Sequence, residues 1–557
     1  MRQNKSIIKA SALIIGCFAV GFCIGLLVGR HGKGNGDCTL TVLETTDVHG
    51  AYFDSLYNGE ARKTSMANVA AYVKNVRKVE KADPILIDNG DNLQGDNAAY
   101  YYNFVDTTSE HIVTSYLKYL DYDAVVMGNH DVETGHPVYD RVCRSGKMPY
   151  LAANAVGEDG KPYFKPYKIV KRHGLKIAII GMTNANIKSW LPEDKWQGID
   201  FVQISAIAQG LVDEVRAKER PDIVIMSVHS GTGKPDRPGP KDLPRPGLEP
   251  RKLGPDIENE AYYLASSLKG VDVVLAGHDH SPAAEVISTP DGEVAFVNGG
   301  SRAQFVGRCD IKLRLKRGKI VSKTFQCKTV PMEGIEPDEA FSKKFRPQFE
   351  EVKAFACRPI GRIMGDIAFD NAIDGPSAYM TLIHTVQLDA TGADISISAP
   401  LSTRGKIGAG PVAFQDLAKI YVYENQLFVV EMTGRQLKDY LEYSYANWIS
   451  RRGPSFNFDS AQGIDYTVSR SAADGSRVKI SGMSDGTPFQ MDKVYKVAMT
   501  SYRASGGGEL LARGAGINPS DLKISEKYKD IRSLIGDWIA ARGEVVPAAA
   551  ANWKFVD

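Results

Sequence analysis

Two things that this 557-residue sequence lacks narrow the class of protein it can be. It has no charge bias, because 68 Lys and Arg face 66 Asp and Glu and leave a net charge of +2. Such a balance gives no reason to expect a nucleic-acid polymer or an acidic surface as a partner. It also has little cysteine, with seven residues and no Cys-x-x-Cys pair. Zinc held by thiolates is therefore not expected.

Two of the seven cysteines flank a predicted β-hairpin. Cys309 and Cys327 border residues 310–326, where apolar and polar residues alternate on both sides of a Lys-Arg-Gly-Lys turn. The two are equally far from Gly318, so they could face each other across the hairpin and pair as a disulfide. Buried reduced thiols are the more common state of isolated cysteines. The sequence leaves both states open.

The first 35 residues depart from the globular composition of the rest. Arg2, Lys5 and Lys9 precede an uncharged stretch from residue 10 to residue 29. At about 1.5 Å per residue this stretch can cross a hydrocarbon core of about 30 Å. Residues 1–35 are therefore predicted to be a signal anchor or a signal peptide, with the membrane as partner in the first case. We expect the remaining chain to be exported, periplasmic or at the cell surface, and anchored by this segment.

Five short apolar segments each end in Asp, Asn or His beside a glycine. The clusters are Thr46-Asp47-Val48-His49-Gly50, Asp88-Asn89-Gly90-Asp91-Asn92, Gly128-Asn129-His130-Asp131, Ser227-Val228-His229-Ser230-Gly231 and Gly277-His278-Asp279-His280. A single cluster is equally well explained as a turn that closes a strand. Strands of an α/β sheet, however, present ligand sites at their carboxyl ends, and helical periodicity intervenes, as over residues 65–78. The recurrence therefore predicts a metal site where the clusters meet.

The ordered set of clusters resembles the calcineurin-like metallophosphoesterase superfamily. The second half of the chain resembles the C-terminal domain of the bacterial 5′-nucleotidase and 2′,3′-cyclic-nucleotide 2′-phosphodiesterase family. Its motifs are Tyr423-Glu424-Asn425, Thr433-Gly434, Phe456-Asn457-Phe458-Asp459 and Tyr502-Arg503-Ala504-Ser505-Gly506-Gly507-Gly508. The resemblance implies a four-layer α/β/β/α sandwich over residues 36–334, a helical linker over 335–359 and a smaller α+β domain that binds nucleotide over 360–557.

The resemblance also implies two divalent metal ions. Asp91 would bridge them, one ion would be completed by Asp47, His49 and His280, and the other by Asn129, His229 and His278. Imidazoles combined with hard oxygen ligands suit Zn, Mn, Fe or Co, among which the ligands do not choose. Two such ions can clamp a phosphoryl group and supply hydroxide near neutral pH.

The family resemblance assigns a separate role to His130, which follows a ligand without being one. It would stabilise charge on the transferring phosphoryl group or assist the leaving oxygen. The carboxylate that orients its ring is either Glu133, three residues further on, or the neighbouring Asp131.

In the second domain the resemblance implies a stacking site for the nucleoside base. Phe456 and Tyr502 would hold the base between them, with Asn457 at its edge. Gly506 and Gly507 would allow the backbone to approach the ligand closely. Arg404 is a candidate for contact with phosphate or base, and is equally well explained as a solvated loop residue.

The expected function is hydrolysis of nucleotide phosphoesters outside the cytoplasm, releasing phosphate and nucleoside. Gly508 stands where some 5′-nucleotidases carry an aspartate, which favours a 2′,3′-cyclic-nucleotide 2′-phosphodiesterase with 3′-nucleotidase activity. A 5′-nucleotidase or nucleotide-sugar hydrolase is the alternative in the same class. A catalytically silent surface binding protein on the same scaffold, or a hydrolase of a non-nucleotide ester, are the alternatives outside it. The sequence does not indicate an oligomeric state.

Overall fold

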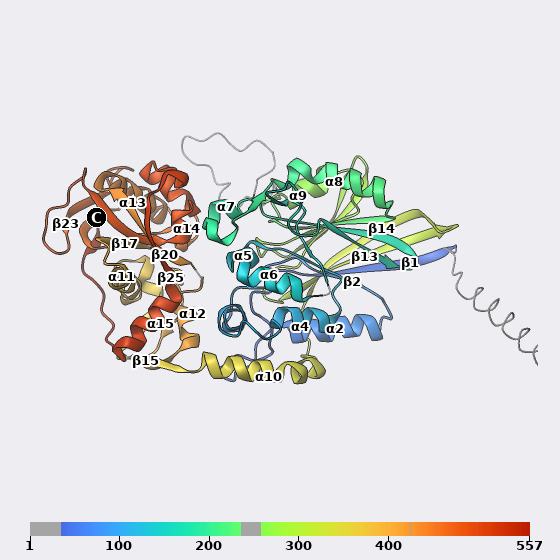
Figure 1. Ribbon diagram of the computed structural model, residues 1–557, viewed down its shortest axis with the longest axis horizontal. Helices are drawn as coiled ribbons and strands as arrows, with labels where there is room; N and C mark the ends of the chain where they lie inside the picture. Colours follow the sequence, from blue (N-terminus) through green and yellow to red (C-terminus); the bar gives the residue numbers. More distant parts are fainter. Residues whose placement is uncertain (1–34, 147, 235–257, 424) are drawn as a thin grey trace, which may run out of the picture.

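The computed structural model describes residues 35–146, 148–234, 258–423 and 425–557. The predicted N-terminal membrane segment lies outside these ranges. Within them, no helix is both long and apolar enough to span a bilayer. Figure 1 shows two bodies side by side, one coloured blue to yellow and the other orange to red, which we call the first and the second domain.

Two six-stranded sheets form the centre of the first domain. Their orders are β14-β13-β1-β2-β3-β4 and β11-β12-β10-β9-β7-β6. The first comprises β1 (Gly36–Thr45), β2 (Ile85–Asp88), β3 (Ala124–Val126), β4 (Tyr150–Leu151), β13 (Phe305–Lys316) and β14 (Lys319–Pro331). The second comprises β6 (Tyr167–Arg172), β7 (Leu175–Thr183), β9 (Ile223–His229), β10 (Val273–Ala276), β11 (Ala283–Thr289) and β12 (Gly292–Asn298). Strands β1 to β4 run parallel, as do β7, β9, β10 and β12.

Side chains on both faces of each sheet are apolar. In β1, Val42 points into the space between the two sheets, whereas the next residue, Leu43, packs on the opposite face. In β9, Ile225 lies between the sheets and Met226 on the outer face. Because neighbouring residues of a strand point to opposite faces, runs of consecutive apolar residues require a cover on each side.

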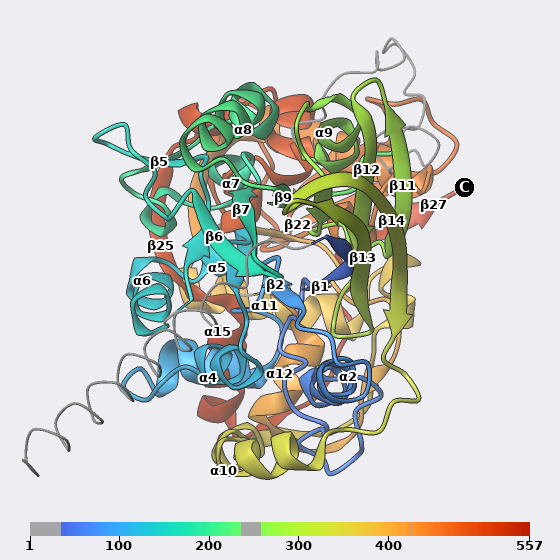
Figure 2. The same cartoon turned by 90° about the vertical axis from the view of Figure 1, so that its right-hand side faces the viewer.

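Helices supply that cover on the outer faces. Figure 2 shows α2 (Met66–Lys78), α4 (Ile112–Leu120) and α10 (Glu339–Ala356) below the sheets, and α8 (Ile204–Glu219) and α9 (Ala261–Ser267) above them. Helix α2 matches the periodicity predicted for residues 65–78 and begins after Ser65, whose side chain accepts the N–H of Ala67. The four-layer α/β/β/α fold predicted from the sequence is confirmed.

The predicted hairpin and the predicted connector are both defined in the structure. Strands β13 and β14 pair with Cys309 directly opposite Cys327, and both thiols are free. Helix α10 fills most of residues 335–359, but its Phe341, Phe345 and Phe349 are buried in the core of the first domain. The helix is thus packed rather than a free connector, and the chain passes from it to the second domain.

The second domain is built on a five-stranded sheet of order β21-β17-β24-β20-β25. Its strands are β17 (Ile395–Ser398), β20 (Gln426–Thr433), β21 (Ser460–Gln462), β24 (Val494–Thr500) and β25 (Ile524–Asp530). One face packs on α13 (Gly434–Ile449), and the other on α11 (Ala378–Thr391) and α15 (Ile531–Arg542). Two three-stranded sheets flank it, formed by β15 (Pro359–Ile363), β19 (Gly410–Ala413) and β26 (Glu544–Val545), and by β22 (Ile464–Ser469), β23 (Val478–Met483) and β27 (Trp553–Val556). The architecture is α+β, as expected.

Candidate active site

The residues predicted as metal ligands lie where parallel strands end. Asp47 and His49 follow β1, Asp91 follows β2, and Asn129 opens the short helix α5 (Asn129–Glu133) after β3. His229 is the last residue of β9, and His278 and His280 follow β10. Carboxyl ends of parallel strands share one edge, so the fold brings these loops together. We call the set the ligand rim: Asp47, His49, Asp91, Asn129, His229, His278 and His280.

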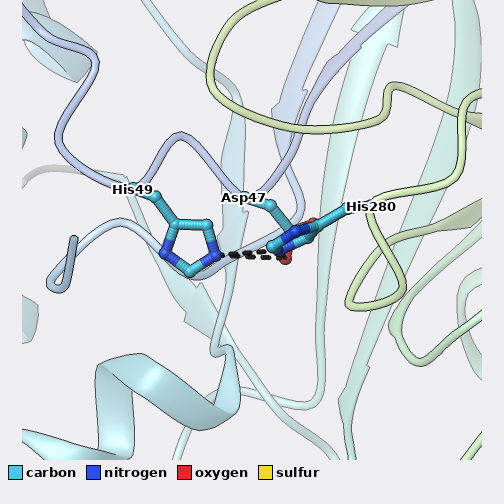
Figure 3. Close-up of side chains that lie close together, drawn as sticks. All are labelled: Asp47, His49 and His280. Carbon is cyan, nitrogen blue, oxygen red and sulfur yellow. Dashed lines mark hydrogen bonds and ion pairs between the residues drawn. The ribbon is translucent and has the colours of Figure 1, made fainter. Parts of the chain in front are cut away.

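Three of these side chains converge at one end of the ligand rim (Figure 3). Nε2 of His49 lies 3.0 Å from Nε2 of His280, and Oδ1 of Asp47 lies 3.8 and 3.4 Å from these two nitrogens. Asp47 Oδ1 is buried and has no hydrogen-bond partner among the described residues. An orphaned buried acceptor costs about 1–3 kcal/mol. Burial lowers the pKa of His49 to about 3, so its ring is neutral. This donor set fits a divalent cation.

The other four side chains form a second group around Asn129. Its Oδ1 lies 3.1 Å from His229 Nε2 and 2.9 Å from His278 Nδ1. Asp91 Oδ2 lies 3.1 Å from His229 Nε2 and 4.0 Å from His49 Nε2 in the first group. Asp91 therefore stands between the two groups, where a carboxylate could serve both. The mixture of imidazole, amide and carboxylate again fits a divalent cation.

Neighbouring groups fix which ring nitrogens face the ligand rim. His229 Nδ1 lies 2.7 Å from the carbonyl oxygen of Asn89, which leaves Nε2 toward Asp91. His278 Nε2 lies 3.4 Å from Glu258 Oε1, which leaves Nδ1 toward Asn129. The ring of Trp190, at the end of α7 (Ile187–Trp190), stacks on His278 with centroids 5.3 Å apart. Such outer contacts orient histidine ligands in metal sites.

Backbone strain is concentrated in the ligand rim. Five of its residues have φ between 46° and 70°, although none is glycine: Asp47, His49, Asp91, His278 and His280. A left-handed conformation costs a non-glycine residue roughly 1–3 kcal/mol and persists where the surroundings impose it. The loops also approach closely, since a Cβ on Gly128 would lie 2.1 Å from Asp91 Oδ1. Strain of this kind is typical of functional sites.

His130 extends from α5 beside the ligand rim and has a clear carboxylate partner. Its Nδ1 lies 2.6 Å from Glu133 Oε2. The carboxylate of Asp131 instead accepts backbone N–H groups from four residues, Gly128, Asp91, Asn92 and Leu93. Asp131 thus joins the loops after β2 and β3, and of the two carboxylates it is Glu133 that contacts the imidazole.

The electrostatic surroundings keep His130 protonated. Burial lowers the pKa of its ring, but the negative charges of Asp91 and Glu133 outweigh burial and raise the pKa to about 9. The backbone N–H of His130 also donates to Asp91 Oδ1 at 2.8 Å. The imidazolium is therefore held beside the ligand rim with Nε2 as its available nitrogen.

The second domain places aromatic rings against His130. Tyr423 stacks on the imidazole, with centroids 6.4 Å apart and planes 7° apart, and meets Phe456 edge-on at 6.3 Å. Burial raises the pKa of Tyr423, and the nearby Tyr502 hydroxyl raises it further. We call Tyr423, Phe456 and Tyr502 the aromatic cluster. Of these three, Phe456 and Tyr502 were predicted from the sequence and Tyr423 was not, although its Tyr-Glu-Asn motif was the available signal.

Arg503 holds together the loops that carry the aromatic cluster. Its guanidinium forms a buried bidentate pair with Asp459, at 2.8 and 2.7 Å. It also donates to Asn457 Oδ1 and to the carbonyl oxygen of Gly507, both at 2.9 Å. A Cβ on Gly507 would lie 2.4 Å from the ring of Tyr502, so the ring position requires glycine there. Arg503 was not predicted from the sequence, since a buried arginine is not distinguishable from an exposed one by its type.

Two other candidates for substrate binding are less engaged. Gly506 has φ 101° and approaches the backbone of Ser189 at the end of the first domain's α7. Arg404 is exposed in the loop after β17 and makes no hydrogen bond or ion pair with a described residue. Its role stays a prediction.

Comparison with known proteins matches both halves of the chain. Residues 40–282 match the calcineurin-like phosphoesterase family and residues 359–513 match the 5′-nucleotidase C-terminal domain. The 2′,3′-cyclic-nucleotide 2′-phosphodiesterase/3′-nucleotidase of Haemophilus influenzae is 26% identical, over 94% of this chain and 88% of that protein. The trifunctional nucleotide phosphoesterase protein YfkN of Bacillus subtilis is 24% identical, over 92% of this chain, which spans 39% of YfkN.

A solved structure has the same fold over nearly the whole chain. It is a candidate 5′-nucleotidase from Staphylococcus aureus in complex with alpha-ketoglutarate, with a TM-score of 0.77 and 22% identity. The match covers 93% of this chain and all of that one. The fold of this chain is therefore shared with a solved protein.

Proposed function

Since this chain belongs to the family that joins a calcineurin-like phosphoesterase domain to a 5′-nucleotidase C-terminal domain, we propose that it is a metal-dependent hydrolase of nucleotide phosphoesters. One observation supports this most strongly. Two ligand groups that share Asp91 lie beside His130, and Tyr423 of the second domain stacks on that histidine. A phosphoryl group on the ligand rim and a base on the aromatic cluster would then belong to one small molecule.

The ligand rim would hold two divalent cations, Zn, Mn, Fe or Co. Asp47, His49 and His280 would hold one cation and Asn129, His229 and His278 the other, and Asp91, which lies between the two sets, would contribute to both. When bound, such cations supply Lewis acidity toward a phosphoryl group. A proton on His229, whose pKa the charges of Asp91 and Asp47 raise to about 10 against the effect of burial, competes with a cation for the same nitrogen.

His130 is the proposed acid. Glu133 holds the ring by Nδ1, so Nε2 can donate a proton to the ester oxygen as its bond to phosphorus breaks. The positive ring also stabilises negative charge on the phosphoryl group before transfer. Both effects require the orientation that Glu133 imposes.

The aromatic cluster would bind the nucleoside base. Every base has a π-face, so rings such as Tyr423, Phe456 and Tyr502 stack on any of them. Arg503 would act through the backbone by fixing the Phe456 and Tyr502 loops, and Asn457 is already hydrogen-bonded to it. Arg404 is the less supported contact, since it is exposed.

The proposed substrates are 2′,3′-cyclic nucleotides and then 3′-nucleotides. Water would open the cyclic diester to a 3′-monophosphate, and a second water would release phosphate and nucleoside. The Haemophilus influenzae relative supports this preference. A 5′-nucleotidase or nucleotide-sugar hydrolase is the second candidate, favoured by the Staphylococcus aureus structure. The apolar residues 10–29 support the proposal that the reaction occurs outside the cytoplasm, which fractionation of cells would test.

A side-by-side assay tests the function. The purified protein, loaded with Mn or Co, would be given 2′,3′-cyclic AMP, 3′-AMP, 5′-AMP and UDP-glucose, and the products separated by chromatography. We expect 3′-AMP and then adenosine from the cyclic substrate. Activity confined to 5′-AMP or UDP-glucose would favour the second candidate. Absence of hydrolysis with all four would favour a binding protein or a hydrolase of another ester.

A further inference from the structure

Arg302 lies at the same edge of the first domain as the ligand rim. It was not among the site residues predicted from the sequence. It follows β12, which runs parallel to β10, so its loop begins at the sheet edge where His278 and His280 lie. The backbone N–H of Arg302 donates to the carbonyl oxygen of Asp47 at 2.8 Å. Its own carbonyl oxygen accepts the Thr64 hydroxyl at 3.2 Å. The loop is therefore fastened directly beside a residue of the ligand rim.

The backbone at Arg302 is strained in the same way as the ligand rim. Arg302 and Ala303 both have φ 53°, and two consecutive non-glycine residues in the left-handed region are costly. Ala303 is buried, whereas the side chain of Arg302 is exposed. The strained pair thus buries the small residue and turns the long cationic one outward.

The side chain of Arg302 lies near Tyr423 of the second domain. Burial raises the pKa of the Tyr423 hydroxyl, and the positive charge of Arg302 opposes that rise, which places the charge close to Tyr423. Tyr423 itself stacks on His130. Within the described residues, Arg302 makes no side-chain hydrogen bond and no ion pair, whereas Arg503, behind the aromatic cluster, is paired with Asp459.

We infer that Arg302 binds the anionic phosphate group of the substrate, between the ligand rim and the aromatic cluster. The inference rests on the proposed function for its substrate class, a phosphate ester. A planar guanidinium donates two parallel hydrogen bonds to phosphate oxygens, and such charge-assisted pairs are the strong ones. The positive charge of a guanidinium at this position would strengthen phosphate binding beyond what the ligand rim provides. It would favour a dianionic monoester over a monoanionic diester.

Binding of inorganic phosphate to the full-length, Mn-loaded protein tests the inference without turnover. Isothermal calorimetry would compare the wild type with Arg302→Gln and Arg302→Lys. Arg317→Gln is the matched control, since Arg317 is also an exposed arginine with positive φ, in the turn between β13 and β14 at the opposite end of β1. We expect Arg302→Gln to bind phosphate about ten- to a hundredfold more weakly, Arg302→Lys to fall between, and Arg317→Gln to match the wild type.

Equal phosphate affinity in the wild type and Arg302→Gln would overturn the inference, and so would a wild type that binds no phosphate. If Arg302 instead pairs with an acidic residue of the second domain, Arg302→Gln would bind phosphate as tightly as the wild type and would have a lower melting temperature. If Arg302→Gln fails to fold, as judged by circular dichroism and Mn content, Arg302→Lys decides by the same criterion.

Kinetics separate this inference from the proposed function. We expect Arg302→Gln to lower kcat/KM by similar factors for 3′-AMP and for p-nitrophenyl phosphate, since both carry the phosphate group. A loss confined to 3′-AMP would mean that Arg302 contacts the nucleoside, and would overturn the inference. If the wild type binds phosphate through Arg302 but hydrolyses no nucleotide, the proposed function is wrong and the inference about Arg302 stands.

Discussion

The ligand rim of the first domain and the aromatic cluster of the second obtain their geometry by different means. In the ligand rim, five non-glycine residues adopt left-handed conformations, and each lies in the loop after a buried parallel strand or at its end. In the loop beside Tyr502, the left-handed positions include the glycines Gly506 and Gly508, and a buried Arg503–Asp459 pair supplies the rigidity. The geometry of the ligand rim is therefore set by the ends of parallel strands. The geometry of the aromatic cluster is set by one ion pair between residues that are distant in the sequence.

This difference predicts different kinetic consequences. Substitutions in the ligand rim should impair every phosphate ester alike, because they alter the groups that meet the phosphoryl group. Substitutions in the aromatic cluster should impair nucleotides selectively, because they alter the contact with the base. A ligand-rim variant that impairs only nucleotides, or an aromatic-cluster variant that impairs every phosphate ester alike, would contradict this difference.

The largest effect is expected from Asp91→Asn, since Asp91 contacts both ligand groups. Loss of its charge should lower kcat by about a thousandfold or more, for 3′-AMP and p-nitrophenyl phosphate equally. Steady-state kinetics and bound Mn measured by plasma emission would check this, with the exposed Asp159→Asn as control. Full Mn content and normal turnover in Asp91→Asn would remove Asp91 from the centre of the site.

The next effect is expected from His130 and its partner. His130→Gln should lower kcat for 3′-AMP by about 10²–10³, as for loss of a general acid, and by less for p-nitrophenyl phosphate, whose leaving group needs no proton. Glu133→Gln should lower kcat by about tenfold, because the ring remains but loses its orientation. Asp131→Asn offers a contrast, since it should destabilise the loops after β2 and β3 instead. An equal loss on both substrates in His130→Gln would argue against proton donation.

A smaller and selective effect is expected from the aromatic cluster. Tyr423→Ala, Phe456→Ala and Tyr502→Ala should each raise KM for 3′-AMP, by up to the about 1–3 kcal/mol that one stacked base contributes. KM for p-nitrophenyl phosphate should change less, and the conservative Tyr423→Phe and Tyr502→Phe should retain nucleotide affinity. The two variants with the largest effect identify the rings that enclose the base. Equal effects on both substrates would refute the stacking role.

The smallest effect is expected on stability rather than catalysis. His384 is buried between the hydroxyls of Ser396 and Ser460, and burial lowers its pKa to about 4. A folded pKa below the unfolded value of about 6.5 gives stability that is present above pH 6.5 and lost as pH falls toward 4, about 2 kcal/mol by pH 5. Urea unfolding of the second domain at pH 7 and pH 5 would measure the loss. His384→Gln should remove that pH dependence, and an unchanged dependence would assign it to other groups.

The sequence predicted the ligand rim because its signal is local. Asp, Asn and His directly after apolar runs identify both the strand end and the ligand chemistry, and the parallel sheets then bring the loops together. The alternation of apolar runs and helical periodicity predicted an α/β fold, and the four-layer arrangement was what the family resemblance implied. Even there, the choice between Asp131 and Glu133 required the structure, since both lie within three residues of His130.

The aromatic cluster was only partly predictable because its signal is not local. Tyr423 belongs to the site through stacking on a histidine of the other domain, which no spacing along the chain reveals. Arg503 is distinguished by its buried ion pair with Asp459, and Arg302 by its left-handed backbone. Neither property can be seen in the sequence. Residues 335–359 were expected to be a helical linker, and the packing of three phenylalanines of α10 on the first domain is a tertiary contact that the sequence does not reveal.

In the proposed complex, one nucleotide is held by metals on the first domain and by rings on the second. A crystal structure with Mn and 3′-AMP, with anomalous scattering recorded at the Mn edge, tests it most directly. We expect two Mn peaks, one among Asp47, His49 and His280 and one among Asn129, His229 and His278. Asp91 should lie between them, and the base should lie against Tyr423, Phe456 or Tyr502. A single peak, or a base bound away from these rings, would contradict it.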